Sequence, residues 1–330
     1  MKVPQRALQN WLGNCLIPNK AASTQSGIRF PGLDVYLCHG TSRNSPNAGI
    51  RGTMKQEEKE ALLEYLVQFS NIEKRFPLFQ GVEDPEAVAD FIGIDVDNFK
   101  KIREAFDLHA RQAAEEILKD EAMMALADKL PFNANDTIAV IGDSITDDRQ
   151  SWFHIMRNLL DLVIPKVKIR YVDASISDSL SADALRRLER DVLTKKPDWV
   201  FVALGSQDAL RLHLIPGRTL VSIAEFWENI NAIESAILQN CKNPPVWITP
   251  PPVIPELMQQ MPLLDGILDE QDLKDFREVI AGKTGFIVDP AGDRMGVPPR
   301  EWNYLNDGYR PSLAGNMETV RSILKTMGKK

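Results

Sequence analysis

The sequence has few of the side chains that build metal sites or disulfide frameworks. Among 330 residues there are three cysteines and four histidines. Cys15, Cys38 and Cys241 lie far apart in the chain, with no C-x-x-C spacing, and no H-E-x-x-H pattern occurs. Widely separated cysteines predict neither a disulfide framework nor a zinc site. We therefore expect no metal and no cofactor.

Positive charge and long apolar runs are also scarce. The formal net charge is −7, whereas a broad nucleic-acid-binding face needs a basic surface. No apolar run approaches the ~18 residues of a membrane span. The first residues, Met-Lys-Val-Pro-Gln-Arg, lack the continuous apolar core of a signal peptide. We expect a cytoplasmic protein that binds neither nucleic acid nor membrane, and a homodimer stays open as its assembly.

Residues 1–132 predict a mainly helical N-terminal domain. The first 50 residues suggest only one short amphipathic helix, around Trp11 to Ile17. Thr53–Gln56 has the spacing of a capping box, and apolar residues recur on one helical face after it. Further helical patterns cover Glu86–Phe91 and Asn98–Asp128.

A helix, glycine turn and second helix over residues 87–99 have the rhythm of a DNA-binding helix-turn-helix. The second helix, which would read the DNA, opens with Asp95 and Asp97, whose charge repels phosphate. A packing or lid module is therefore the favoured interpretation. A regulator that acts through this helical module is the last of three functional hypotheses.

From residue 137 onwards, short apolar segments alternate with helical patterns. Strands that are apolar on both faces and separated by helices are typical of a buried parallel sheet. Residues 133–330 therefore predict a three-layer α/β/α sandwich of the flavodoxin-like type, with five parallel strands and right-handed crossovers. The expected strands are Thr137–Ile141, Val167–Val172, Trp199–Leu204, Val246–Thr249 and Phe286–Val288. The expected helices are Ser151–Val163, Ala182–Thr194, Ile223–Gln239, Asp269–Ile280 and Ser312–Met327.

Polar residues follow these strands at the carboxyl edge of the sheet, where open α/β sheets bind their ligands. Ser144 would lie beside a helix N-terminus, where backbone N–H groups favour developing negative charge. The candidate binding residues after the first three strands and before the last helix are Asp143, Ser175, Asp178, Gly205, Gln207, Asp208 and Arg310, and the candidate catalytic residues are Ser144, Asp307 and His213.

Three motifs resemble those of the SGNH/GDSL hydrolase family of esterases and acyl hydrolases. They are Gly142-Asp143-Ser144-Ile145-Thr146, Gly205-x-x-Asp208 and Asp307-Gly-x-x-Pro311-Ser-x-x-Gly315. The resemblance implies that Ser144 is a nucleophile and that Asp307 orients a histidine base three residues later. It also implies an oxyanion hole made by the N–H of Ser144, a glycine N–H after the second strand and an asparagine side chain.

The chain departs from the family pattern at three of these positions. Arg310 stands in place of the histidine, Gln207 in place of the asparagine, and Ser175, by ungapped alignment, in place of the glycine. Asp178 replaces a second glycine of the same loop. A guanidinium has no acceptor and cannot take a proton from Ser144. Loss of the base from a Ser-His-Asp unit costs on the order of 10⁶-fold in turnover, so we expect very little triad hydrolysis.

Two further functional hypotheses concern the pocket around Ser144. The first is a pseudo-hydrolase, or an enzyme with reassigned chemistry, that takes a small anionic or acylated ligand. Arg310, together with Arg211 and Arg218, could attract an anion, or Arg310 could instead pair with Asp307 or Asp178. The alternative is an active serine esterase or acyltransferase in which His213 replaces the missing base, because it follows Asp208 closely on the same rim.

Overall fold

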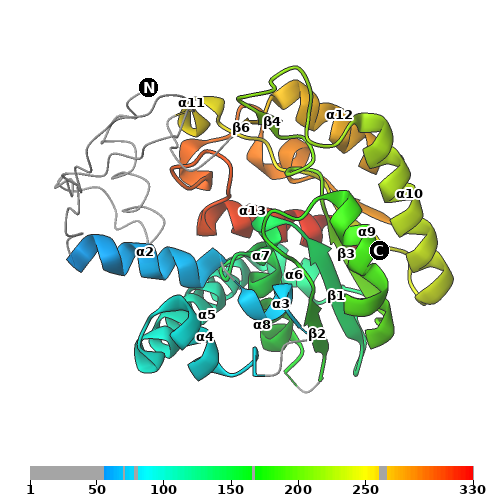
Figure 1. The fold of residues 1–330 in the computed structure, drawn as a ribbon. Helices are drawn as coiled ribbons and strands as arrows, with labels where there is room; N and C mark the ends of the chain where they lie inside the picture. The colour runs from blue at the N-terminus through cyan, green and yellow to red at the C-terminus, as the bar shows by residue number, and fades with distance from the viewer. Residues whose placement is uncertain (1–55, 70, 78–80, 166–167, 260–265, 330) are drawn as a thin grey trace, which may run out of the picture.

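A computed structural model of the chain describes residues 56–329 apart from 70, 78–80, 166–167 and 260–265. The helix expected around Trp11 and most of the capping box at Thr53–Gln56 lie outside the described residues. The five predicted parallel strands are confirmed, and their order in the sheet is β2-β1-β3-β5-β7. Figure 1 labels the first three of these, with β1 between β2 and β3. Their bounds are β1 Thr137–Gly142, β2 Arg170–Asp173, β3 Trp199–Ala203, β5 Val246–Ile248 and β7 Phe286–Val288.

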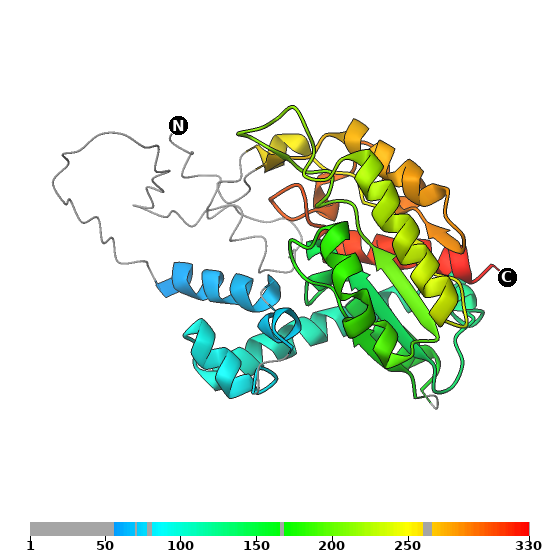
Figure 2. The same cartoon turned by 45° about the vertical axis from the view of Figure 1, so that its right-hand side comes forward.

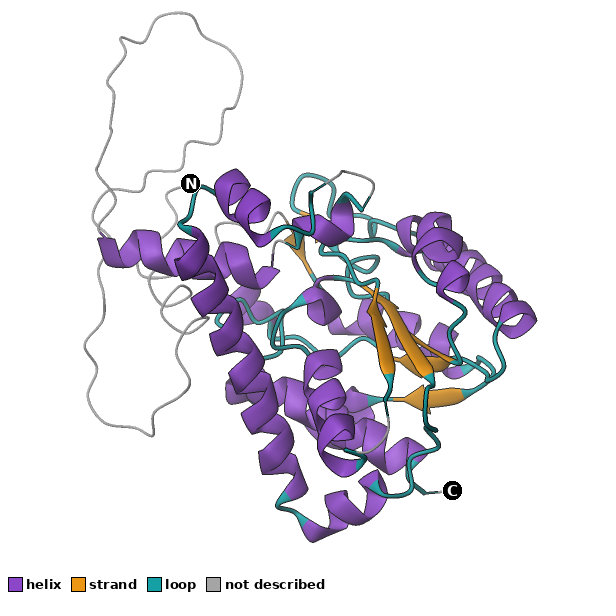
Figure 3. Ribbon diagram, turned by 90° about the horizontal axis from the view of Figure 1, so that it is seen from below, coloured by secondary structure: helices purple, strands orange, loops and turns teal. Residues whose placement is uncertain are grey.

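The sheet is buried on both faces, which explains why its strands are apolar without alternation. Every residue of β1, β3 and β5 is buried. One face packs against helices α9, α10 and α12, and the other packs against α5, α8 and α13. Figure 3 shows the strands between these two helical layers. These helices span α5 Val96–Leu118, α8 Trp152–Val163, α9 Ser181–Asp191, α10 Ile223–Asn240, α12 Glu270–Ala281 and α13 Leu313–Met327.

The N-terminal region is helical, as predicted. It contains α2 Gln56–Phe69, α3 Ile72–Arg75, α4 Pro85–Ile92, the long helix α5, and α6 Glu121–Ala127. The first half of α5 buries Phe99 and Phe106 against α2 and α4. The second half places Ala113 and Ile117 in the same core as α8, α13 and the sheet. Helix α5 thus connects the small helical cluster to the α/β layers (Figure 2), and the domain boundary at residue 132 stays a prediction.

The helix-glycine-helix pattern forms as two packed helices. Gly93 ends α4 in the left-handed conformation, with φ of 79°, which glycine adopts without steric cost. Asp95 then caps α5 by accepting hydrogen bonds from the N–H groups of Asp97 and Asn98. The acidic start of α5 therefore has a local structural role, and the expectation that this module does not bind DNA stays a prediction.

Several short elements at the carboxyl edge of the sheet were not predicted. They are α7 Ser144–Asp147, the antiparallel strands β4 Arg211–Leu212 and β6 Gly266–Ile267, and α11 Pro255–Met258. Elements of two to four residues are too short to show a hydrophobic period. Among the described residues, no helix combines the length and apolar character needed to cross a membrane.

Candidate active site

Ser144 lies at the first position of the short helix α7, directly after β1. Asp143 is the N-cap of this helix, and its Oδ1 accepts a hydrogen bond from the N–H of Ile145 at 3.1 Å. Gly142 ends the strand where space is limited, because a Cβ there would lie 2.8 Å from the side chain of Thr146. Ser144 thus lies at a helix N-terminus, as predicted, although this helix is the unpredicted α7 and not the one expected from Ser151. Its side chain is fully buried.

Asp178 makes two hydrogen bonds to the hydroxyl of Ser144. Its backbone N–H donates to Oγ at 2.8 Å, and Oγ lies 3.2 Å from Oδ1 of the same residue as a donor. Asp178 is exposed and has φ of 63°, a conformation that favours glycine. Ser175, by contrast, donates its N–H to Asp173 Oδ1 at 3.0 Å. Of the two loop positions considered from the sequence, it is therefore 178 that contacts the serine.

Asp307 is buried and surrounded by donors from its own loop. Its Oδ1 accepts from the backbone N–H groups of Tyr309 and Arg310, at 2.9 and 2.8 Å. Its Oδ2 accepts from Nη1 of Arg310 at 3.0 Å. The residue at the expected histidine position therefore pairs with the acid of the motif, as a histidine would, but supplies only donors.

Helix α2 contacts the other side of the Arg310 guanidinium. Its carbon Cζ lies 4.7 Å from the ring centroid of Phe69 and 6.0 Å from that of Tyr65. Nη1 is also 3.4 Å from the hydroxyl of Tyr65. A guanidinium within about 6 Å of an aromatic ring is attracted by the ring quadrupole. Arg310 thus joins the motif acid to the N-terminal helices.

The other two arginines proposed for an anionic pocket are engaged elsewhere. Arg211 forms a two-contact ion pair with Asp272, at 2.5 and 2.8 Å, and Arg218 donates to the backbone carbonyls of Thr219 and Leu220. Because Arg310 pairs with Asp307, the ion-pair alternative is the one that the geometry favours over an anion-binding cluster.

The loop after β3 holds the remaining predicted residues. Oε1 of Gln207 accepts a hydrogen bond from the hydroxyl of Tyr309 at 3.3 Å. The oxygen of the side-chain amide that was expected in the oxyanion hole is therefore already bonded. Asp208 is buried and accepts from the N–H and the hydroxyl of Ser181, at 2.9 and 2.5 Å. Asp208 therefore fixes the start of α9. Gly205, with φ of 117°, makes the turn that follows β3.

The described histidines occupy different surroundings. His213 is exposed, one residue after β4, and its role as a substitute base stays a prediction. His154 is buried, with Nε2 3.6 Å from Asp173 Oδ2, and burial lowers its pKa. His109 bonds to Gln150 through Nδ1 at 3.0 Å. The hydroxyl of Ser144 thus has a carboxylate, rather than an imidazole, as its nearest acceptor.

Helix α3 contacts both α7, the helix that carries Ser144, and the loop that carries Asp178. Nζ of Lys74 lies 2.5 Å from Asp147 and 2.8 Å from Asp173. Burial lowers the pKa of Lys74, but the two carboxylates outweigh this effect and raise it above its ordinary value. Asp147 also accepts from the N–H and the hydroxyl of Ser177, both at 2.8 Å. A chain of contacts therefore runs from α3 through Asp147 to the residue before Asp178.

Three further polar contacts attach α2 and α3 to the residues after α7. Gln68 donates to Asp148 at 2.9 Å, and Arg149 bonds to Asn71 and Glu73 at 2.7 and 2.6 Å. These partners are far apart in the sequence, and each is an ordinary polar residue with no motif around it. Sequence reasoning had no signal that could connect them.

Asp143 is an unusual carboxyl because it is buried beside other acids. Burial raises its pKa to about 7, and the charges of Asp208 and Asp178 act in the same direction. The backbone N–H groups of Ile145 and Gln207 oppose the shift only in part. No group of three or more potential ligands in the described part of the chain is arranged to hold a metal ion.

Comparison with known proteins identifies the family. Residues 140–317 match the model of the GDSL-like Lipase/Acylhydrolase family. The match covers more than half of the chain, and the chain therefore belongs to this family. An acetylxylan esterase from Geobacillus stearothermophilus is 30% identical over 101 residues, which make up 26% of this chain and 46% of that protein. The chain thus spans about half the length of that relative.

Solved structures of similar proteins support the same fold. A catalytic serine mutant of an acetylxylan esterase from Geobacillus stearothermophilus has a TM-score of 0.50 and 21% identity, covering 61% of this chain and 98% of that one. An alpha/beta hydrolase enzyme from the metagenome of Lake Arreo, Spain, has a TM-score of 0.50 and 21% identity, covering 60% and 97%. At these identities the likeness establishes the SGNH hydrolase fold.

The raised pKa of Asp143 predicts that stability falls as pH rises. Folded Asp143 keeps its proton to a pH of about 7, whereas the unfolded residue loses it near pH 4. The folded state thus gains from proton binding at low pH, and up to about 4 kcal/mol of this gain is lost between pH 4 and 8. Asp143→Asn should therefore be similar in stability to wild type in urea unfolding near pH 4, more stable by roughly 1–1.5 kcal/mol at pH 5, and more stable by up to about 4 kcal/mol at pH 8.

The matched control is Asp84→Asn, an exposed N-cap that likewise accepts from the N–H two residues on. It should keep the pH profile of the wild type. A profile of Asp143→Asn that stays parallel to wild type from pH 5 to 8 would show that Asp143 is ionised throughout in the folded protein.

The position of Lys74 between two carboxylates predicts a large effect of its removal. Lys74→Met keeps most of the apolar stem but leaves Asp147 and Asp173 without their cation, and should cost roughly 3–5 kcal/mol in urea unfolding. Arg75→Ala removes only an exposed bond to the carbonyl of Ser177 and should cost less than about 1 kcal/mol. Equal, small losses in both variants would contradict the docking role of Lys74.

Proposed function

We propose that this chain is a pseudo-hydrolase of the GDSL-like family, which binds a small acylated ligand without efficient turnover. The observation that carries the proposal is the ion pair of Arg310 with Asp307, at 3.0 Å. In a Ser-His-Asp unit the acid orients a base. Here the acid holds a guanidinium that cannot accept a proton.

The surroundings of Ser144 support the same conclusion. The N–H of Asp178 donates to Oγ at 2.8 Å, which engages one of the two lone pairs of this oxygen. The exposed Asp178 side chain also lies against this fully buried hydroxyl. A nucleophile needs a neighbouring base that can take its proton, and the arrangement instead holds Ser144 as a structural hydroxyl.

The ligand class is inferred from the relatives. The named relative is an acetylxylan esterase, and a structure of such an esterase from the same organism is a catalytic histidine mutant. We take Arg310 to stand where such a histidine acts. A protein that keeps the fold and loses the base is suited to hold an acylated molecule rather than to cleave it.

One observation favours the alternative, an active serine esterase. The hydroxyl of Ser144 lies 3.2 Å from Asp178 Oδ1, within about the reach that a general base needs. In this reading Asp178, or His213 after a movement of its loop, would accept the proton. The following experiment separates the two functions.

Arg310→His should restore reactivity that the wild type lacks, because Asp307 is already placed to orient an imidazole at this position. A fluorophosphonate probe reports an activated serine by covalent labelling. We expect the wild type and Ser144→Ala to label equally weakly, and Arg310→His to label at least about tenfold faster, since one general base contributes ~10²–10⁴-fold.

Two controls make this result specific. Arg300→His adds a histidine at an exposed arginine of the same segment and should leave labelling at the wild-type level. Arg310→His combined with Ser144→Ala should lose the gain. Rapid labelling of the wild type that disappears in Ser144→Ala would overturn the pseudo-hydrolase and establish the serine esterase.

A further inference from the structure

A hollow in the surface lies at the opposite edge of the sheet from Ser144. It has a volume of about 660 Å³ and is formed around the first residues of β1 and β2. Ligand sites commonly have volumes of ~300–1,000 Å³. Because Ser144 follows the other end of β1, this hollow is separate from the candidate active site.

The charged side chains that line this hollow are cationic. They are Lys168, Arg170, Lys195 and Lys196, and the described lining includes no aspartate or glutamate. Two carboxylates beside the lining, those of Asp198 and Asp161, bond to the backbone N–H of Thr137 and the hydroxyl of Tyr171. Within the described part of the chain, none of the four cations takes part in an ion pair. Most other arginines in the described part of the chain pair with carboxylates, so Arg170 is an exception among them. Lysines without an ion pair are common among the same described residues, and the three lysines are distinguished by their place around the same hollow.

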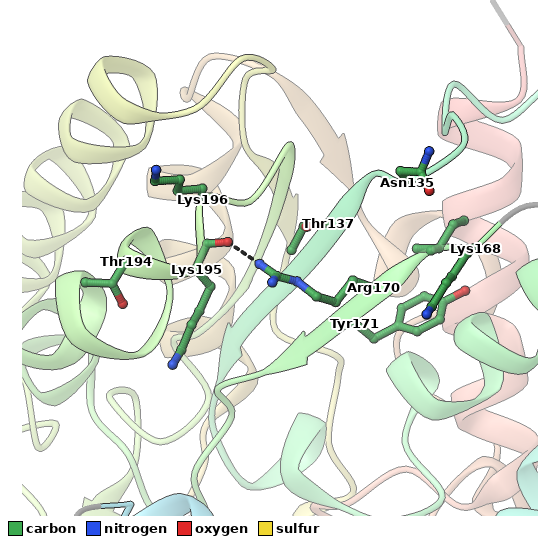
Figure 4. Close-up of a pocket in the computed structure, with 9 residues that line it drawn as sticks. Asn135, Thr137, Lys168, Arg170, Tyr171, Thr194, Lys195 and Lys196 are labelled. Carbon is green, nitrogen blue, oxygen red and sulfur yellow. Dashed lines mark hydrogen bonds between the residues drawn. The ribbon is translucent and has the colours of Figure 1, made fainter.

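The backbone and one side-chain bond set the arrangement of these cations. The guanidinium of Arg170 donates to the backbone carbonyl of Lys195, which ties the start of β2 to the turn after α9 (Figure 4). Lys195 lies on one side of Arg170 and Lys168 on the other. Lys196 has φ of 52°, a left-handed conformation in which a non-glycine residue is uncommon. Thr137 and Thr194 also line the hollow.

We propose that this hollow is a binding site for a small molecule that carries more than one phosphate group. Arginine and lysine are the side chains that bind phosphate, arginine by paired N–H donors and lysine as a point charge. Cations on both sides of Arg170 suit a ligand whose negative charge is spread over two groups rather than concentrated on one. The site is independent of the chemistry at Ser144.

The test is a titration of the full chain with pyrophosphate, followed by calorimetry at ~50 mM and ~200 mM salt, because exposed charge interactions weaken as the Debye length shortens. We expect saturable binding that weakens at the higher salt. Lys195→Gln combined with Lys196→Gln, and separately Arg170→Gln, should each weaken binding at least about tenfold. That factor corresponds to about 1.4 kcal/mol.

The matched control is Lys100→Gln combined with Lys101→Gln, two adjacent exposed lysines of α5, which changes the net charge equally. It should shift the dissociation constant less than twofold. Orthophosphate should bind more weakly than pyrophosphate. Citrate, which carries carboxylates in place of phosphates, should also bind more weakly if the site recognises phosphate. No saturable binding of pyrophosphate, or an equal loss in the control variant, would overturn the site.

Discussion

The guanidinium of Arg310 is the group on which the arrangement of this protein depends. On one side it pairs with Asp307 at 3.0 Å, and on the other it lies 4.7 Å from the centre of the Phe69 ring. The first contact belongs to the loop that supplies the acid and base in the GDSL-like family. The second belongs to a helix at the beginning of the described chain. One residue thus pairs with the acid of the motif and contacts the N-terminal helices, and in the proposed function it also stands in place of a proton acceptor.

The N-terminal helices are consequently part of the site. Lys74 holds Asp147 and Asp173, and Asp147 in turn holds the loop that ends at Asp178. Buried ion pairs contribute little net stability over an apolar replacement, but removal of one partner is costly. This explains why the region can be polar in sequence and still firmly attached. It also couples the position of Asp178, and hence of Ser144, to the docking of α3.

The sequence predicted the layers well and the contacts around Ser144 poorly. All five parallel strands, and the place of Ser144 after the first of them, could be predicted because they depend on local apolar runs and on motif residues. The pairing of Arg310 with Asp307 was one of the alternatives considered. Its contact with Phe69 could not be foreseen, because residues 241 positions apart (310 − 69) meet only through the tertiary fold. The same holds for Lys74, and for Asp178, whose N–H direction follows from a left-handed backbone that a non-glycine residue rarely adopts.

The most direct test is a double-mutant cycle between Arg310→Met and Phe69→Leu, in which urea unfolding measures the coupling free energy between the two side chains. If Arg310 attaches α2 to the motif loop, the two substitutions should be coupled by about 0.5–2 kcal/mol, the range of cation–π contacts from exposed to desolvated. The exposed pair of Arg300 and Trp302, with 5.1 Å between the guanidinium carbon and the ring centroid, provides the reference and should give a smaller coupling. Additive effects of the Arg310 and Phe69 substitutions, within about 0.3 kcal/mol, would contradict the proposed link between the lost base and the docked helix.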